Sequence, residues 1–254
     1  MAFGAIIIGD EILSGRRQDK HLVKLIELLA ARGLSLAWAR YCGDDRAQLT
    51  ALLRESLAGD DIVFSFGGIG ATPDDHTRQS AAAAAGVALV LHPEAEAAIR
   101  ERFGDETTPL RLRMGEFPAG SRIIPNPYNR IPGFAYGRHH FLPGFPEMAW
   151  PMAAWILDTW YADLHDTQAR VEASVIVYGA REGDLIPFME ALEAEHGVSI
   201  FSLPSLGTVT QPRHIELGAK GEVAAVEAAM ALIKAEMTRR GLVWVLAQDT
   251  RPAA

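Results

Sequence analysis

Short apolar runs alternate with amphipathic stretches through the first two thirds of the chain. Residues 3–8 form an apolar run that predicts a strand, and residues 19–31 repeat leucine and isoleucine at the spacing of a helix. The same alternation continues with a predicted strand, helix and strand at 36–41, 45–58 and 61–66. Strands that are apolar on both faces and alternate with amphipathic helices predict a parallel sheet covered on both sides.

The pattern changes after residue 103. Prolines, glycines and arginines are frequent over 103–144, which predicts loops around short strands, with a hairpin over 134–142. A helix rich in Trp and Met is expected over 146–161. His139 and His140 have side chains on opposite faces of the second hairpin strand, so they cannot share a metal ion, and we expect both on the surface.

The hydrophobic pattern divides the chain into two domains. Residues 1–162 carry the alternating strands and helices, residues 163–170 are polar and form the expected linker, and residues 171–254 form a smaller domain. The smaller domain has the predicted order strand, helix, strand, strand, helix, strand, at 171–178, 182–195, 198–202, 213–217, 222–240 and 242–246. This order predicts a small α+β domain.

The composition is that of a folded protein, and it excludes several classes of function. The 254 residues are 49% hydrophobic with a net charge of −8, which argues against disorder. Because duplex binding needs clustered Lys and Arg, no nucleic-acid partner is expected. Runs without charged residues are shorter than the ~20 apolar residues of a membrane span, so no membrane partner is expected either. A single cysteine, Cys42, and an N-terminus without a basic region favour the cytoplasm.

The segment from Phe66 to Thr77 carries the most informative chemistry. It reads FGGIGATPDDHT and lies between a predicted strand and a predicted helix, which is where an open α/β sheet binds its ligand. Gly67, Gly68 and Gly70 would let the backbone turn N–H groups toward a phosphate beside the helix N-terminus. The segment matches neither the dinucleotide-binding Gly-x-Gly-x-x-Gly pattern nor a Walker loop.

Two adjacent carboxylates in this segment change the expected ligand. Asp74 and Asp75 would repel a phosphate unless a cation lay between them, and Mg²⁺ is commonly held by one or two carboxylates plus substrate phosphates. The pair therefore predicts a divalent metal. The local sequence is equally compatible with Asp74 capping the coming helix and Asp75 stabilising its first turn, so both interpretations stay open.

Two further loops follow predicted strands. Asp10 and Glu11 come just after the first strand and could face the glycine segment, since the carboxyl ends of parallel strands share one edge of a sheet. Asp19, further along this loop, is better explained locally as an N-cap. Gly144 and Glu147 lie between the hairpin and the following helix, where a structural turn is favoured over catalysis.

Together these motifs resemble one known family. The segment 67–77 is similar to the Gly-Gly-x-Gly-x-Thr-x-Asp-Asp-x-Thr motif of the CinA amino-terminal domain, which belongs to the MoaB/Mog-type molybdopterin-binding superfamily. The resemblance extends, in order, to the segments 9–15, 43–45, 132–134 and 143–148. Residues 171–254 look like the KH-like middle domain of CinA proteins, and the amidohydrolase domain that many of these proteins carry is expected to be absent.

The resemblance implies a three-layer α/β/α fold with a mostly parallel sheet, whose ligand is molybdopterin, another phosphorylated pterin, or a nucleotide-like pyrophosphate. The candidate ligand-binding residues are Gly67, Gly68, Gly70, Thr72, Thr77, Asp19, Gly144 and Glu147. The candidate catalytic and metal-binding residues are Asp75, Asp74 and Asp10.

Two functional hypotheses follow. The first is an enzyme that hydrolyses a pyrophosphate bond in ADP-ribose or a related dinucleotide, with Mg²⁺ or another divalent ion on the three aspartates. The second is a non-catalytic pterin- or nucleotide-binding or regulatory module, or a protein of molybdenum-cofactor biosynthesis. This alternative stays open because Ala71 and His76 depart from the CinA pattern beside the expected ligand. A homo-oligomer is expected from the superfamily resemblance and the helix rich in Trp and Met.

Overall fold

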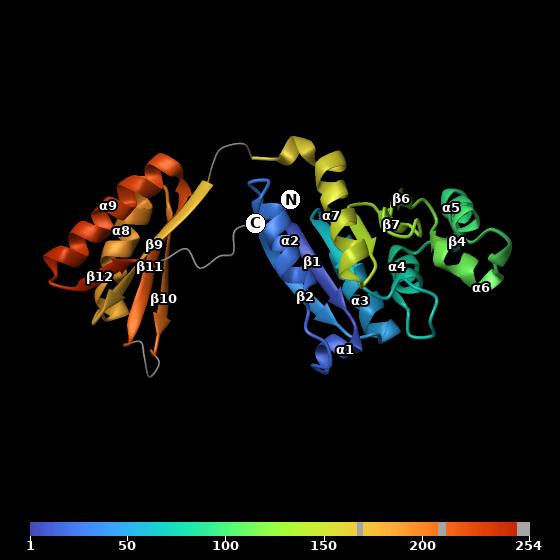
Figure 1. The fold of residues 1–254 in the computed structure, drawn as a ribbon, viewed down its shortest axis with the longest axis horizontal. Coiled ribbons are helices and arrows are strands. Elements are labelled where there is room, and N and C mark those ends of the chain that lie inside the picture. The colour runs from blue at the N-terminus through green and yellow to red at the C-terminus, as the bar shows by residue number, and fades with distance from the viewer. Residues whose placement is uncertain (167–169, 208–211, 248–254) are drawn as a thin grey trace. The chain divides into compact units, whose positions relative to one another are not determined.

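The computed structural model describes residues 1–166, 170–207 and 212–247. It divides into two compact units, Met1–His165 and Asp166–Ala254, each of which is described by itself (Figure 1). Residues 167–169 of the expected linker lie outside the described residues, as do 208–211 and 248–254 of the expected smaller domain.

A six-stranded sheet forms the centre of the N-terminal unit. Its strands are β1 (Phe3–Ile8), β2 (Leu36–Cys42), β3 (Ile62–Phe66), β6 (Arg122–Ile124), β7 (Gly133–Tyr136) and β8 (His139–Leu142), in the spatial order β2-β1-β3-β8-β7-β6. The pairs β1–β2, β1–β3 and β3–β8 are parallel. The predicted hairpin supplies the antiparallel pair β7–β8, and β6 pairs antiparallel with β7. The expectation of a mostly parallel sheet is confirmed.

Helices cover both faces of this sheet. Alternate residues of β1 point to opposite sides: Ala5 and Ile7 pack with helices α2 (His21–Ala30) and α7 (Pro146–Trp160), while Ile6 and Ile8 pack with α3 (Arg46–Leu57) and α4 (Thr77–Ala85). Strand β1 therefore buries both of its faces, as its continuous apolar sequence predicts. The result is the expected three-layer α/β/α fold.

The chain leaves this layered core between α4 and β6. Here it forms strand β4 (Leu89–Leu91), helices α5 (Pro93–Phe103) and α6 (Pro109–Leu112), and strand β5 (Glu116–Pro118). Strands β4 and β5 pair as a separate two-stranded antiparallel sheet. Figure 1 shows α5, α6 and β4 together beside the main sheet. A short 3₁₀ helix, Arg113–Gly115, connects α6 to β5 and carries Met114.

The structure corrects one expectation within the core. His139 and His140 do point to opposite faces of β8, but both are buried rather than on the surface. The reason is that β8 lies between β3 and β7, inside the sheet. Nε2 of His139 forms a hydrogen bond with the Ser56 hydroxyl at 2.9 Å, and Nδ1 of His140 donates to the Val63 carbonyl oxygen at 3.1 Å. Burial lowers the pKa of His139 to about 4 and that of His140 to about 3, so both are neutral.

The C-terminal unit has a four-stranded antiparallel sheet and two helices. Its elements are β9 (Arg170–Tyr178), α8 (Ile186–His196), β10 (Ser199–Ser205), β11 (His214–Glu222), α9 (Val223–Arg239) and β12 (Val243–Leu246). The strands lie in the order β10-β11-β9-β12, and both helices bury apolar side chains against one face of the sheet. The predicted α+β character of this region is confirmed. Neither unit contains, among the described residues, a helix long and apolar enough to cross a membrane.

Candidate functional site

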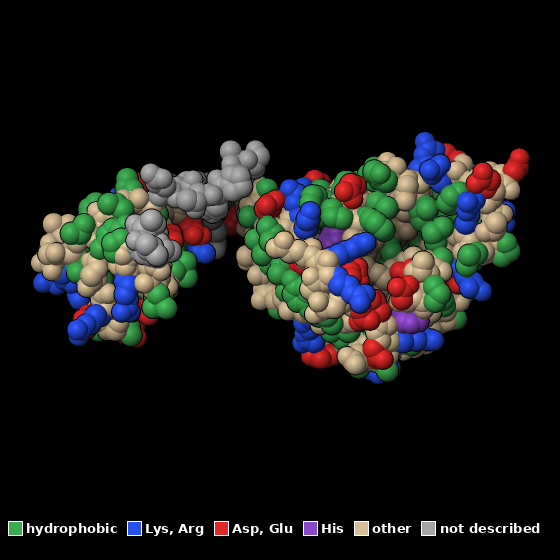
Figure 2. All heavy atoms as spheres, turned by 60° about the horizontal axis from the view of Figure 1, so that its bottom comes forward, with side chains coloured by type: hydrophobic (Ala, Val, Ile, Leu, Met, Phe, Trp, Pro, Cys, Tyr) green, Lys and Arg blue, Asp and Glu red, His purple; other side chains and the backbone are tan. Residues whose placement is uncertain are grey.

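A cavity of about 460 Å³ opens at the carboxyl ends of three parallel strands in the N-terminal unit. Its walls include the residues that follow β1, β3 and β8, namely Gly9, Gly67 and Pro143. An open α/β sheet binds ligands at this edge, where the loops after neighbouring strands meet. In the space-filling view, acidic side chains gather beside hydrophobic ones on this unit (Figure 2).

The turn after β3 favours glycine at three positions, and at two of them the backbone also has positive φ. A Cβ at Gly67 would overlap the Ile8 carbonyl oxygen, one at Gly68 the Thr77 hydroxyl, and one at Gly70 the Asp75 carboxylate. Gly67 and Gly68 also have φ values of +107° and +67°, which side-chain-bearing residues rarely adopt. The glycine pattern thus allows a chain path that runs against β1 and α4.

The backbone polarity of this turn suits an anion. Thr77 holds two of its carbonyl oxygens, since its hydroxyl donates to Gly67 at 2.9 Å and its N–H donates to Gly68 at 3.0 Å. Within the part of the chain that the structure describes, the N–H groups of residues 68–71 donate to no protein group. All four residues line the cavity. Successive unpaired N–H groups around a concave surface form an anion-binding nest.

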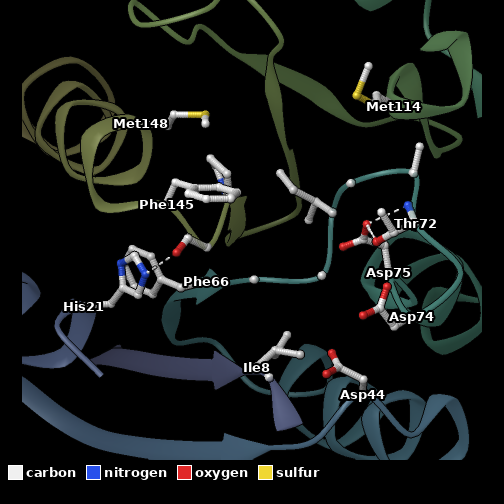
Figure 3. A pocket seen from close by; sticks show the side chains of 18 of the residues that line it. Ile8, His21, Asp44, Phe66, Thr72, Asp74, Asp75, Met114, Phe145 and Met148 are labelled. Carbon is white, nitrogen blue, oxygen red and sulfur yellow. Dashed lines mark hydrogen bonds between the residues drawn. The ribbon is translucent and has the colours of Figure 1, made fainter. Parts of the chain in front are cut away.

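The paired carboxylates lie beside this turn (Figure 3). One oxygen of Asp75 accepts hydrogen bonds from the Thr72 N–H at 2.8 Å and the Thr72 hydroxyl at 2.5 Å. The nearby Thr72 side chain and the backbone N–H of Asp74 itself lower the pKa of the Asp74 carboxyl group, which is therefore ionised at neutral pH. Helix α4 begins at Thr77 without a side-chain cap and without an acidic residue in its first turn. The capping interpretation of Asp74 and Asp75 is therefore wrong.

Asp44 lines the cavity, and the carboxylate of Asp10 is engaged beside it. Asp10 begins a short helix, α1 (Asp10–Leu13), where its carboxylate accepts from the Asp44 N–H at 3.1 Å and its N–H donates to the Asp44 carboxylate at 2.9 Å. Asp44 and Glu11 line the cavity, whereas Asp10 does not. Burial raises the pKa of Asp44, and the negative charges of Asp10, Glu11 and Asp74 raise it further. Asp44 was missed, although the Gly43-Asp44-Asp45 motif after the second strand was a signal for it.

Three other candidate residues do not line the cavity. Asp19 accepts hydrogen bonds from the N–H groups of His21 and Leu22 and from the Tyr41 hydroxyl, as its N-cap interpretation predicts. Thr77 is fully buried behind the glycine turn. Glu147 lies in the first turn of α7 and does not line the cavity. Gly67, Gly68, Gly70, Thr72, Asp74, Asp75 and Gly144 do line it.

The opposite end of the cavity is apolar, and sequence analysis missed most of it. Figure 3 shows Phe66, Phe145 and Met148 across the cavity from the carboxylates. The His21 ring stacks on Phe66 with centroids 4.7 Å apart, and its Nε2 donates to the Gly144 carbonyl oxygen at 3.1 Å. Burial lowers the pKa of His21, so the ring is neutral. Its only sequence signal was a histidine at the start of an amphipathic helix.

A polar turn completes this end of the cavity. The Asn126 amide donates to the Asn129 side chain at 2.8 Å and to the Ile131 carbonyl oxygen at 2.9 Å. These bonds hold Arg130 in the left-handed backbone region at φ 64°, which disfavours residues other than glycine. Asn126, Asn129 and Ile131 all line the cavity. The turn therefore places two internally hydrogen-bonded amide groups beside an apolar wall of the cavity.

The acidic side chains do not form a closed metal site. Across the described ranges 1–166, 170–207 and 212–247, no group of three or more His, Cys, Asp or Glu side chains is placed to hold a metal ion. Asp74 and Asp75 could contribute one or two ligands to an ion that also binds phosphate oxygens, which is the usual arrangement for Mg²⁺. The residues therefore fit an ion shared with a ligand better than a resident ion.

Comparisons with known proteins agree with this geometry. A family model described as "Probable molybdopterin binding domain" matches residues 4–162. A CinA-like protein of Anaeromyxobacter is 39% identical over 145 residues, which cover 54% of this chain and 35% of that protein. A protein of Pyrobaculum arsenaticum is 28% identical over 222 residues, which cover 84% of this chain and 81% of that protein. The chain spans about a third of the length of the first CinA-like relatives that it matches.

One solved structure supports the fold. The crystal structure of the protein CinA from Thermoplasma acidophilum, described as of unknown function, has a TM-score of 0.57 and 29% sequence identity. The match covers 65% of this chain and all of that one. The resemblance to the CinA amino-terminal domain that the motifs indicated is confirmed.

Proposed function

The chain belongs to the family of probable molybdopterin binding domains, and from this premise we propose that its cavity binds a phosphorylated pterin or nucleotide. The row of unpartnered N–H groups at 68–71 carries this proposal, because such a row is a binding site for phosphate oxygens. The cavity of about 460 Å³ lies within the range of roughly 300–1,000 Å³ that is typical of small-molecule sites.

The two ends of the cavity suit the two parts of such a ligand. The phosphate lies against the turn at 67–71, and the ring lies against Phe145 and Met148, with the amides of Asn126 and Asn129 at its edge. Apolar walls with a few fixed polar groups are how proteins hold and orient flat heterocycles. Molybdopterin and an adenine nucleotide both combine a phosphate group with a flat heterocycle, so both belong to the proposed ligand class.

Hydrolysis of a pyrophosphate bond in an ADP-ribose-like ligand is the finer proposal. Asp74 and Asp75 stand beside the phosphate site, where their negative charge opposes binding unless a cation intervenes. A divalent ion bound with the ligand would supply that charge neutralisation and would stabilise charge that develops on a pyrophosphate oxygen. The carboxylate of Asp75 orders Thr72 with one oxygen. Its second oxygen is the proposed ligand of the ion.

The test is a titration of ADP-ribose and of a molybdopterin-type ligand, each with and without Mg²⁺, followed by analysis of products. We expect Asp75→Asn to weaken Mg²⁺-dependent ADP-ribose binding by about tenfold or more, because it removes a charge that the ion neutralises while keeping an acceptor for Thr72. The matched control is Asp45→Asn, which removes an exposed charge nearby at the N-cap of α3, where Asn caps as well as Asp.

Each outcome separates the hypotheses. Metal-dependent binding of ADP-ribose that yields AMP supports a pyrophosphatase. Binding of either ligand without turnover supports a non-catalytic binding module, for which the engagement of Asp10 by Asp44 is the favouring observation. If Asp75→Asn and wild type bind ADP-ribose equally in Mg²⁺, the proposed role of Asp75 is wrong.

A further inference from the structure

Arg78 is a charged side chain in a place where a charge is costly. It is the second residue of α4, it is only 2% exposed, and it does not line the cavity. Transfer of a guanidinium from water into the interior costs several kcal/mol unless hydrogen bonds and opposite charge compensate it. The contacts of Arg78 therefore need an explanation.

Those contacts go to backbone carbonyl groups on two walls of the cavity. Nη2 donates to the Gly70 carbonyl oxygen at 2.6 Å, in the glycine turn. Nη1 donates to the carbonyl oxygens of Arg113 and Glu116, which lie on either side of the cavity-lining Met114. A planar guanidinium presents its donors in a fixed fork, so it sets the spacing between the two walls.

The ion pairing of Arg78 is incomplete. The nearest carboxylate oxygen in an ion pair with it belongs to Glu116, at 3.8 Å, and the Glu116 side chain is 39% exposed. The buried Nε of Arg78 has no hydrogen-bond partner among the described residues. The Asp75 carboxylate beside the glycine turn adds to the electrostatic compensation of this buried charge.

The bond to Gly70 also sets the direction of an amide in the turn. In a planar trans peptide the C=O and the following N–H point in opposite directions. Because the Gly70 carbonyl points to the buried Arg78, the Ala71 N–H points away from it, and Ala71 lines the cavity. Arg78 therefore fixes one of the four unpartnered N–H groups.

We propose that Arg78 is a positioning residue for ligand phosphate, which locks the glycine turn to the Met114 wall and gives the turn a positive charge that offsets Asp75. This inference deepens the proposed function and rests on it for the identity of the ligand. The link between the two walls can be tested without any ligand.

Three variants separate the charge, the fork and the general effect of losing an arginine. Arg78→Met removes both the charge and the donors, Arg78→Lys keeps the charge without the fork, and Arg54→Met removes an exposed arginine on α3 as the matched control. The ligand-free readouts are the amide NMR signals of Gly70 and Ala71 and the methyl signal of Met114. The binding readouts are titrations with ADP-ribose in Mg²⁺ and with inorganic pyrophosphate, and melting curves confirm that each variant is folded.

We expect Arg78→Met to shift the Gly70, Ala71 and Met114 signals together and to weaken both titrations by about tenfold or more. Arg78→Lys should recover part of the affinity, which a purely structural role of the fork would not allow, and Arg54→Met should match wild type. If Arg78→Met binds both probes as wild type does, phosphate positioning by Arg78 is excluded. If wild type binds neither probe but the Gly70, Ala71 and Met114 signals shift in Arg78→Met, the proposed ligand is wrong and the connection of the two walls through Arg78 is supported. Unmoved signals overturn the link in every case.

Discussion

Two glycine-containing turns form neighbouring walls of the same cavity, and a buried side chain holds each of them. In the turn after β3, Gly70 accepts a hydrogen bond from Arg78. In the turn after β8, Gly144 accepts one from His21. The first donor keeps its charge at all working pH values, whereas burial lowers the pKa of His21 and keeps it neutral. The charged donor lies behind the end proposed for phosphate, and the neutral one lies at the apolar end.

The turns also differ in how much they need glycine. A Cβ at Gly67 would overlap the Ile8 carbonyl oxygen in a backbone with φ +107°. A Cβ at Gly144 would meet its nearest neighbour, the Cα of Gly67, at 3.5 Å, an ordinary van der Waals distance, and φ is not positive there. The first turn is therefore shaped by steric necessity, and the second by hydrogen bonding and the packing of aromatic rings.

The largest expected difference between the two turns is the stability that each loses when its glycine is replaced by alanine. Gly67→Ala should destabilise the N-terminal unit by about 3 kcal/mol or prevent folding, because it adds both backbone strain and an overlap with a backbone atom. Gly144→Ala should change the free energy of unfolding by less than about 1 kcal/mol. Urea denaturation of the two variants measures the difference. Equal losses would show that the two turns are under the same steric constraint.

An intermediate loss of stability is expected on substitution of Thr77, which forms hydrogen bonds with the turn after β3. Its buried hydroxyl donates to the Gly67 carbonyl oxygen, so Thr77→Val should cost about 1–3 kcal/mol by leaving that acceptor unpaired. Thr77→Ser keeps the hydroxyl and is the matched control. If valine and serine are equally stable in urea denaturation, the hydrogen bond does not hold the turn.

The smallest effect is expected at His21 and depends on pH. His21→Phe keeps the stack on Phe66 but loses the bond to Gly144, at a cost of about 1 kcal/mol at pH 8. Burial holds the folded-state pKa of His21 below the ordinary histidine value of 6.5. As the pH falls below 6.5, His21 is protonated in the unfolded chain before it is protonated in the folded protein. The free energy of unfolding of wild type therefore decreases, whereas His21→Phe lacks this contribution.

The measurement is urea denaturation of wild type and His21→Phe in steps from pH 8 to pH 5. The gap between them should narrow as the pH falls. His139 and His140 are present in both proteins, so their own acid destabilisation cancels. A gap that stays constant over this range would mean that His21 titrates alike in the folded and unfolded states.

The sequence predicted most of the layered core, because hydrophobic periodicity is a local property. The strands at 3–8 and 61–66 and the helix at 146–161 differ from the observed elements by one residue at most. The glycine segment was also found from sequence, since strand, glycines and helix occur there in an order that has few structural solutions.

The sequence was a poor guide where the environment of a side chain depends on residues that are distant in the sequence. Asp44, which lines the cavity and accepts a hydrogen bond from the Asp10 N–H, was not among the expected site residues. His139 was expected on the surface, and the position of β8 within the sheet buries it. Pattern analysis assigns a polar residue to solvent by default, because it cannot see which elements will cover it.

By itself, the sequence determined the order of the elements, the parallel sheet and the need for glycine after β3. Each follows from preferences that act within a few residues of the chain. Only the tertiary structure decided which polar groups support the cavity. The donors that hold its walls come from far along the chain, since His21 and Gly144 are 123 residues apart and Arg78 and Arg113 are 35 apart. Such pairs form only when the folded core brings them together and excludes the water that would otherwise satisfy them.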